Sequence, residues 1–472
     1  MLELIQSGRP LTLRQRLVLT ARLSWPAIMA QLSSILMQYI DAAMVGRLGA
    51  VDSAAVGLVS TSLWLFWGVC SAATVGFSVQ VAHAMGAAEY GRARDIMRQG
   101  ILASFLFGTL IAVIGVSISQ FLPHWLGGSE EICAPASRYF LVFVAALPLL
   151  SLNYIGCGVL RAAGNMKVPG GLNVMMCVLD VIFNFLLIFP TRQLAVFGMT
   201  FTMPGAGLGV LGAALGTVAA EVVTASSVIW YLLTRQENLA LTRVKEKLGR
   251  LRFSRNVSLK AVKVAAPLTL EHAVICGAQI MITVIVAPLG AIAIAANAFA
   301  VTAEALCYMP GYGIGDAATT LVGQSYGAGR KDLARQFGYI TTASGMVIMS
   351  VMGILLWIFA PSVMALMSPV QGIIDLGAEV LRIEAWAEPM FAASIVAYGA
   401  MVGVGDTIVP ACMNFMSIWL VRVPLAAFLA PAMGLRGVWI AMCIELCFRG
   451  AIFLWRLASG AWLKHGLKTS RP

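Results

Sequence analysis

Residues 26–50 read PAIMAQLSSILMQYIDAAMVGRLGA, and residues 267–291 read PLTLEHAVICGAQIMITVIVAPLGA. Each stretch opens with proline and closes with Leu-Gly-Ala, and a constant step, from 26 to 267, carries the first onto the second. The step maps 26–94 onto 267–335 without a gap. It also carries Pro148, Gly158, Gly164, Pro169 and Asn173 onto Pro389, Gly399, Gly405, Pro410 and Asn414. This register predicts two copies of one unit.

The composition is that of a protein immersed in lipid. Of the 472 residues, 60% are hydrophobic and only 11% are charged, whereas soluble proteins carry about 25% charged residues. Twelve apolar segments are long enough to cross ~30 Å of hydrocarbon, six in each copy: 17–46, 53–85, 93–120, 132–160, 168–190, 207–234, 257–288, 293–325, 333–361, 373–402, 408–432 and 434–462. We therefore expect an all-α polytopic membrane protein with twelve transmembrane helices, arranged as two pseudo-symmetric six-helix lobes.

Basic residues predict the orientation, because Lys and Arg accumulate in short cytoplasmic loops. They are concentrated before the first helix, after the second, fourth and eighth helices, and in the segment 235–263. Both termini are therefore expected in the cytoplasm. The net charge of +11 reflects this topology, and we expect no nucleic-acid partner.

An even number of helices places the start of both copies on the same side of the membrane, which makes them parallel repeats. The predicted organisation is a first lobe over 1–234, a basic cytoplasmic linker over 235–256 and a second lobe over 257–472. Residues 191–206 have no counterpart in the second copy. We expect them to form an external loop or a short hairpin.

The sequence lacks the patterns typical of enzymes and of cofactor sites. Its nine cysteines and four histidines show no metal-ligand or disulfide spacing, and it contains no Gly-Lys-Ser/Thr loop for a nucleotide. We therefore expect no enzymatic activity and no cofactor. An ion gradient of H+ or Na+ is the natural source of energy.

Polar residues of the first lobe form a candidate ion site. An ionised side chain at the centre of a membrane helix costs roughly 2.5–3.5 kcal/mol, so it needs a partner, water or a proton. Asp180 and Asn184 are one turn apart and share a helix face. Asp41 lies in the outer part of the first helix, and Thr217 lies at a similar depth on the helix after Asn184. These oxygens suit a proton or a hard cation, including sodium, and the alternative is an interhelical hydrogen-bond seam.

The second lobe carries further acids within its apolar segments. Glu271 follows a proline that loosens the helix and admits water to the carboxyl group. Glu304 lies about halfway along an otherwise apolar helix. Glu384 and Glu388 are one turn apart, so mutual repulsion favours proton binding by one of them, with neutralisation by Arg382 as the alternative.

Three other acidic residues are predicted to have structural roles. Glu445 and Arg449 are four residues apart on a helix and should pair with each other. Asp316 and Asp406 lie near helix ends and are interpreted as turn or capping residues.

Several motifs occur in a fixed order along the chain. They are Pro26, Asp41 and Gly46 in the first helix, the turn GVLRAAGN at 158–165, Val322-Gly323-Gln324 ahead of Gly327, and the turn at 399–407. In order and spacing these motifs resemble the multidrug and toxic compound extrusion (MATE) family, from about residue 17 to residue 460.

The resemblance implies a V-shaped pair of six-helix lobes whose central cavity opens alternately to either side. It implies export of organic cations in exchange for protons or sodium. Glu271 resembles the helix-seven acid of members that carry one. The first-lobe ion site implied by the resemblance consists of Asp41, Asn153, Asp180, Asn184 and Thr217, with an interhelical hydrogen bond as the alternative role of Asn153.

The chain also departs from the family pattern. The family's first-lobe site can hold Asn and Asp where this chain has Asp180 and Asn184, which moves the charge by one turn. Several members carry an acid in the stretch that matches 390–398, where this chain has none and Glu388 is the nearest substitute. Val402 stands where an arginine is usual.

Our hypothesis is a secondary multidrug antiporter of the inner membrane, a monomer surrounded by lipid that exchanges cationic or amphipathic small molecules for protons or sodium. Glu271, Glu304 and Glu388 are its candidate substrate or proton carboxylates. One alternative is a lipid-linked oligosaccharide flippase, whose anionic cargo would require basic residues in the cavity, whereas the mid-membrane charges here are mostly acidic. An intramembrane enzyme is a second alternative, for which the sequence holds no catalytic signature.

Overall fold

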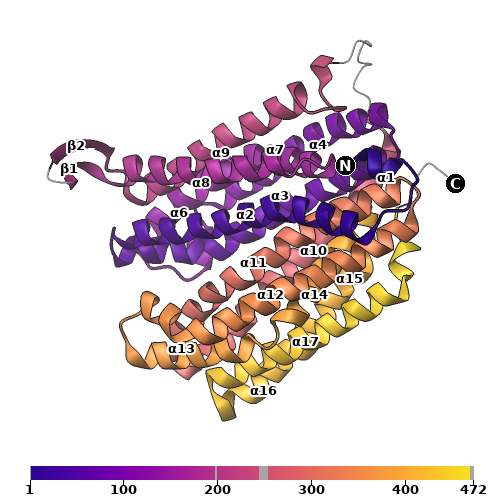
Figure 1. Cartoon of the computed structure of the whole chain (residues 1–472). Helices are drawn as coiled ribbons and strands as arrows, with labels where there is room; N and C mark the ends of the chain where they lie inside the picture. Colours follow the sequence, from indigo (N-terminus) through magenta and orange to yellow (C-terminus); the bar gives the residue numbers. More distant parts are fainter. Residues whose placement is uncertain (1, 197–198, 244–252, 468–472) are drawn as a thin grey trace.

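The structure is a computed structural model that describes residues 2–196, 199–243 and 253–467. Within these residues ten helices are long and apolar enough to cross a membrane, and two bent helix pairs bring the number to twelve if each pair is one span. The predicted all-α fold of two six-span lobes is therefore confirmed (Figure 1). Residues 244–252 of the predicted linker lie outside the described residues, and the exact lobe boundaries stay a prediction.

The first lobe contains six spans and a β-hairpin. Its elements are α1 (Leu2–Gln6), α2 (Leu13–Gly46), α3 (Ala50–Gly86), α4 (Tyr90–Ile118), α5 (Leu122–Trp125), α6 (Glu130–Ala145), α7 (Leu147–Ala162), α8 (Lys167–Ile188), β1 (Pro190–Val196), β2 (Met199–Ala206), α9 (Gly209–Thr234) and η1 (Leu241–Arg243). The first span, α2, starts at a capping box, in which the backbone N–H of Gln15 donates to Thr12 Oγ1 and the backbone N–H of Thr12 donates to Gln15 Oε1.

The second lobe repeats the six spans without the hairpin. Its elements are α10 (Arg255–Val286), η2 (Ala287–Leu289), α11 (Ala291–Gly327), α12 (Lys331–Met367), α13 (Gln371–Glu384), α14 (Glu388–Val404), α15 (Ile408–Met416), η3 (Ser417–Arg422), α16 (Val423–Met433), α17 (Leu435–Ser459) and η4 (Ala461–Leu463). The π-helical turn η3 joins α15 to α16, so that these three segments form one span.

The structural repeat follows the step found in the sequence. Helix α3 begins and ends at Ala50 and Gly86, and α11 begins and ends at the repeat-related residues Ala291 and Gly327. The turns ahead of both helices depend on glycine, because Gly49 and Gly290 have φ values of +131° and +97°.

The fourth span of each lobe is bent, which the sequence analysis did not predict. Helices α6 and α7 meet at 45°, and α13 and α14 meet at 58°. Pro148 and Pro389 lie at the start of α7 and α14. Because proline removes a backbone donor and clashes with the preceding turn, it accounts for both breaks.

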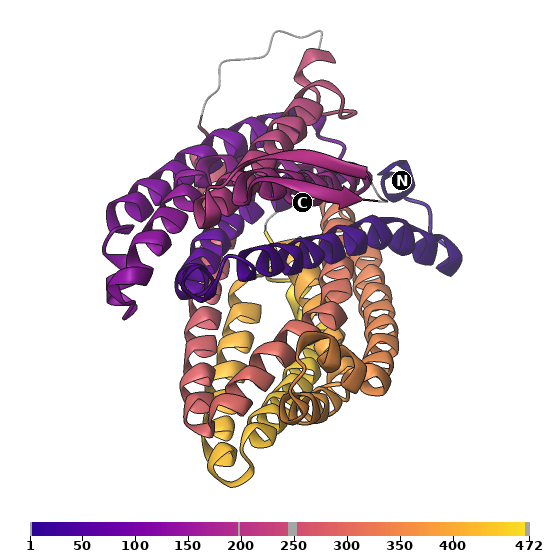
Figure 2. The same ribbon diagram turned by 90° about the vertical axis from the view of Figure 1, so that its left-hand side faces the viewer.

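Residues 190–196 and 199–206 form the antiparallel strands β1 and β2, so the insertion contains a hairpin, one of the two expected outcomes. Figure 1 shows this hairpin at one end of the bundle and α1, near the start of the chain, at the other. We call these the hairpin end and the terminal end. Figure 2, viewed from the hairpin end, shows the first lobe above the second.

The two lobes meet at the terminal end through α3 and α11. A Cβ added to Gly86 would lie 1.9 Å from the carbonyl oxygen of Gln324, and one added to Gly327 would lie 2.1 Å from that of His83. The side chain of Gln324 donates to the carbonyl of Ala162 at 2.8 Å. In Figure 1 the ribbons of the two lobes approach here and diverge toward the hairpin end. The structure therefore represents the state closed at the terminal end.

Candidate functional site

The structure brings together four of the five predicted first-lobe residues, three of them through one shared amide group. The amide nitrogen of Asn184 donates to Asp41 Oδ1 at 2.9 Å and to Asp180 Oδ2 at 3.1 Å. The two carboxyl groups also contact each other. Asp180 and Asn184 are fully buried between α2, α8 and α9, and Asp41 is half-buried. We call Asp41, Asp180 and Asn184 the first-lobe cluster.

Close helix packing shapes the first-lobe cluster. A Cβ added to Gly216 of α9 would lie 2.1 Å from Asn184 Oδ1, so glycine is required for α9 to approach α8 this closely. Thr217, the next residue, contacts the Asp180 carboxyl and donates to its own helix at Ala213 O, 3.2 Å away. Among the described residues, Asp180 Oδ1 and Asn184 Oδ1 have no hydrogen-bond partner. These buried free oxygens are acceptors for a proton or a small cation.

Asn153 does not join this arrangement. Its amide donates to Glu221 Oε1 at 2.7 Å, and Cys157 Sγ donates to its Oδ1 at 3.3 Å. Both Asn153 and Glu221 are buried. The structure therefore pairs Asn153 with an acid of α9, whereas the resemblance implied that it belongs with Asp41.

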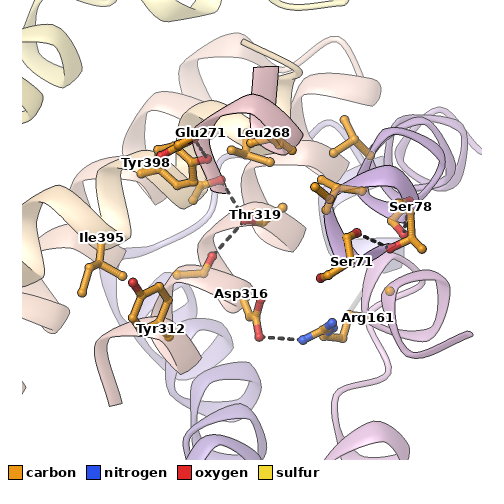
Figure 3. Close-up of a pocket in the computed structure, with 18 of the residues that line it drawn as sticks. Ser71, Ser78, Arg161, Leu268, Glu271, Tyr312, Asp316, Thr319, Ile395 and Tyr398 are labelled. Atoms are coloured by element: carbon orange, nitrogen blue, oxygen red, sulfur yellow. Dashed lines mark hydrogen bonds and ion pairs between the residues drawn. The ribbon is translucent and has the colours of Figure 1, made fainter. Parts of the chain in front are cut away.

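A cavity of about 290 Å³ lies between the lobes, and Glu271 forms part of its wall (Figure 3). The hydroxyl of Tyr398 donates to Glu271 Oε2 at 2.5 Å, and the amide of Asn414 donates to Oε1 at 2.5 Å. Among the described residues no Lys, Arg or His nitrogen forms an ion pair with this carboxyl group. Glu271 is only 7% exposed and forms no ion pair among the described residues. Arg449, which lines the same cavity, acts on it electrostatically but is bound to Glu445.

An ion pair between the lobes borders the same cavity. Arg161 at the end of α7 contacts Asp316 of α11 at 2.6 Å, as the dashed line in Figure 3 marks. Asp316 lies within α11 and away from its ends, so the prediction of a turn or capping role was wrong. Asp406, in contrast, lies in the turn between α14 and α15 and forms a buried ion pair with Arg456.

Glu304, Glu384 and Glu388 lie together within the second lobe and are absent from the described wall of the cavity. Arg382 forms no ion pair among the described residues and donates to the carbonyl of Trp357 at 3.2 Å, so it does not neutralise Glu384 and Glu388.

The predicted pairing of Glu445 with Arg449 is confirmed at 3.0 Å. Arg422, from the π-helical turn, also binds Glu445, at 2.6 Å. A single carboxylate therefore holds two arginines.

Three groups at the cavity were missed in the sequence: Tyr398, Asn414 and the Arg161–Asp316 pair. Asn414 could have been identified from the sequence, because it occupies the position of the internal repeat that corresponds to Asn173. Tyr398 could not have been identified in this way, since a single tyrosine in an apolar helix is common and indicates no particular role. Among the described residues no group of three or more His, Cys, Asp and Glu side chains could hold a metal ion.

Comparison with known proteins places this arrangement in a family. The sequence profile of the MatE family matches residues 26–186 and 267–428, one match in each lobe. The probable multidrug resistance protein NorM of Thermotoga maritima is 26% identical over 455 residues, covering 95% of this chain and 93% of that protein. The multidrug resistance protein NorM of Burkholderia vietnamiensis is 27% identical, with 95% of each chain covered.

Solved structures share the fold. One described as MATE in complex with MaL6 has a TM-score of 0.86 at 21% identity and covers 98% of this chain and 99% of its own. A MOP superfamily transporter from Pyrococcus furiosus has a TM-score of 0.86 at 20% identity, with 98% of both chains covered. The profile matches both lobes in the register of the internal repeat, which confirms the predicted family. The chain is therefore a multi-pass membrane transporter of the MatE family.

Proposed function

We propose that this protein exports small organic cations by antiport with protons or sodium. The observation that carries this proposal is Glu271, a carboxyl group at the wall of the interlobe cavity that forms no ion pair among the described residues. An acid that is not tied up in an ion pair, in a space of low dielectric, attracts a cationic guest more strongly than it would in water. The NorM relatives are named as multidrug resistance proteins, in one case as a probable one, which supports the same class of cargo.

The cavity wall fits a cation that also carries apolar surface. Tyr312, Phe391 and Tyr398 line it beside Glu271. Aromatic faces attract cations through their quadrupoles and cover apolar groups at the same time. The cargo class we infer is therefore monovalent, amphipathic and organic.

The coupling ion binds at the first-lobe cluster in this proposal. Asp41 and Asp180 share one amide donor and have no ion-pair partner among the described residues. A proton or a sodium ion there relieves the repulsion between the two acids. Its arrival changes how α2 packs on α8, and α2 contacts the second lobe through the hydrogen bond from Tyr39 to the carbonyl of Thr302.

We place the terminal end in the cytoplasm and the hairpin end outside, in the inner membrane of a bacterial cell. The basic residues near the terminal end support this orientation, and the bacterial sources of the NorM relatives support the membrane. The state closed at the terminal end is then the one that faces outward.

A flippase for an anionic lipid-linked cargo is less consistent with the cavity. Its two arginines are both engaged, Arg161 with Asp316 and Arg449 with Glu445. A pyrophosphate group would need free basic side chains.

The test is efflux from proteoliposomes loaded with a fluorescent organic cation. A proton gradient and a sodium gradient are imposed separately, for the unsubstituted protein and for Asp41→Asn and Glu271→Gln. Glu379→Gln is the matched control, because Glu379 is an exposed residue paired with Arg436 at 2.8 Å. Movement of a labelled lipid-linked oligosaccharide is measured in parallel.

We expect one of the two gradients to drive efflux, and both Asp41→Asn and Glu271→Gln to abolish most of the driven rate while the control retains it. An inside-negative potential should change the rate if exchange is electrogenic, since ~2.3 kcal/mol acts on each charge per 100 mV. Unchanged efflux in both variants, or lipid movement without cation efflux, would refute the proposal.

A further inference from the structure

Three glutamates of the second lobe are buried together and unpaired. Glu384 ends α13, Glu388 begins α14, and Glu304 lies on the neighbouring helix α11. Glu384 and Glu388 are 0% exposed, and Glu304 is 6% exposed. Each of the three carboxyl groups interacts electrostatically with at least one of the others.

These acids lack the partners that buried acids elsewhere in the protein have. Among the described residues, neither oxygen of Glu384 or Glu388 accepts a hydrogen bond. No ion pair of a described residue involves Glu304 either. Glu271, in contrast, accepts hydrogen bonds at both oxygens. Buried polar oxygens in proteins almost always have a partner, so oxygens without one indicate a functional role or a bound water, ion or proton.

Charge around the three acids does not balance. The other titratable groups that face them come from α11, the π-helical turn η3 and α17: Cys307, Tyr308, Tyr312, Arg422, Cys443, Glu445 and Arg449. The titratable residues of α12 all precede Ile340 and lie at the terminal end. Arg422 and Arg449 both bind Glu445. Two arginines thus face four glutamates, which leaves an excess of two negative charges if all ionise.

Protons meet this excess better than a metal ion does. Among the described residues no group of His, Cys, Asp and Glu is arranged to hold a metal. A proton, in contrast, binds a single carboxyl group and does not need several side chains to point at one place. An ionised carboxylate in such surroundings is costly, and neutralisation removes the cost.

Comparison of the two repeats indicates that the fold itself does not require these acids. Phe143, Leu147 and Leu63 occupy the repeat-related positions of Glu384, Glu388 and Glu304 in the first lobe. All three are buried apolar side chains at the equivalent bend. The same packing is therefore achieved without carboxyl groups, and their presence in one lobe only points to a ligand.

We propose that Glu304, Glu384 and Glu388 form a proton-binding site of the second lobe, which holds two protons and is closed to the interlobe cavity in this state. The site lies at the bend between α13 and α14, so a change of the bend exposes it. This inference is separate from the first-lobe cluster and does not depend on the cargo or on the coupling ion proposed above.

Infrared spectroscopy of the purified full-length protein in lipid nanodiscs tests this site, because protonated carboxylic acids have a carbonyl-stretch band distinct from that of carboxylates. Spectra are recorded at neutral pH for the unsubstituted protein, Glu384→Gln, Glu388→Gln and the surface control Glu379→Gln. We expect each of the first two variants to lose band intensity and the control to lose none. In the unsubstituted protein the band should shift slowly on transfer to heavy water, because the site is closed.

A double variant, Glu384→Phe with Glu388→Leu, carries the apolar residues found at the equivalent positions of the first lobe. Because those residues pack well there, this variant should fold even if the glutamine variants do not. It should lose the band while keeping the melting temperature of the unsubstituted protein. Full band intensity in both glutamine variants and the double variant would overturn the proposal. Loss of the band on addition of sodium at constant pH would also overturn it, since a sodium ion would then be the ligand.

Discussion

At the scale of single residues, Asn184 is the group on which the first-lobe cluster depends. One amide group donates to two carboxylates, 2.9 and 3.1 Å away, so it sets the distance between Asp41 and Asp180. A donor shared in this way stabilises the charged forms and keeps both acids pointed at the same space. The coupling ion would enter between oxygens that Asn184 has already arranged.

Replacing Asn184 with alanine should weaken binding of the coupling ion. Hydrogen bonds to charged groups contribute about 1.5 kcal/mol or more, which corresponds to roughly tenfold in affinity. The measurement is the rate of cation efflux against the concentration of the driving ion, where the half-saturating concentration should rise about tenfold. Asn256→Ala, at an exposed position of α10, should leave it unchanged. An unchanged value in Asn184→Ala would remove this residue from ion binding.

The sequence was informative for residues that share one helix or neighbouring helices. The four-residue spacing of Asp180 and Asn184 already placed them on one face. The pairing of Asn153 with Glu221 and the contact of Arg161 with Asp316 were not predictable. Both depend on how separate helices pack, which periodicity within one helix does not specify.

At the scale of elements, the glycine contact between α3 and α11 decides how closely the lobes approach. Gly86 and Gly327 are repeat-related and lie against the backbone of the opposite helix. A side chain at either position would meet a carbonyl group that has no room to move. The contact is therefore specific to the state closed at the terminal end.

Leucine at Gly86 should destabilise that state. Overpacking costs about 1–3 kcal/mol, and a coupling of that size shifts an equilibrium about 5- to 150-fold. Distances between spin labels at the ends of α3 and α11 should report a larger population with the terminal end open. Gly57→Leu is the control, since a Cβ at Gly57 of the same helix meets nothing within 4 Å. Equal spin-label distances in Gly86→Leu and Gly57→Leu would show that the glycine contact does not stabilise the state closed at the terminal end.

Element boundaries were predictable where apolar runs were long. The bends at 145–147 and 384–388 were not predicted, because the segments 132–160 and 373–402 are each long enough for one span and were interpreted as single helices. Pro148 and Pro389 carried the signal for both breaks. The hairpin at 190–206 was one of two expected outcomes, since an insertion between helices does not specify its own structure.

At the scale of the whole molecule, the protein is two lobes that approach most closely at the terminal end and also contact each other through α2 and α11. The Arg161–Asp316 pair crosses between them beside the cavity, and each side chain is 31% exposed. A half-exposed pair contributes modestly, on the order of 1 kcal/mol. Opening of the terminal end must break it, so it biases the equilibrium toward the state closed at that end.

Asp316→Asn should therefore favour opening of the terminal end by about fivefold, the factor that corresponds to 1 kcal/mol. The spin-label distances used for Gly86→Leu provide the measurement. The exchanged pair, Arg161→Asp with Asp316→Arg, should restore part of the original distribution. No shift in the single variant would show that the ion pair does not stabilise this state.

The two-lobe architecture was predictable because a gap-free repeat and twelve apolar segments leave little freedom. The end at which the lobes meet was not. It depends on contacts between helices of the two lobes, such as that of α3 with α11, which the pattern within one helix does not specify.

The central claim is that Glu271 attracts a cationic cargo into the cavity. Calorimetric titration of the purified protein with tetraphenylphosphonium, and with the anion tetraphenylborate of nearly the same shape, tests it most directly. The account predicts that the cation binds, that the anion does not, and that Glu271→Gln weakens cation binding about tenfold or more, equivalent to about 1.4 kcal/mol. Equal binding of both ions, or full cation affinity in Glu271→Gln, would contradict it.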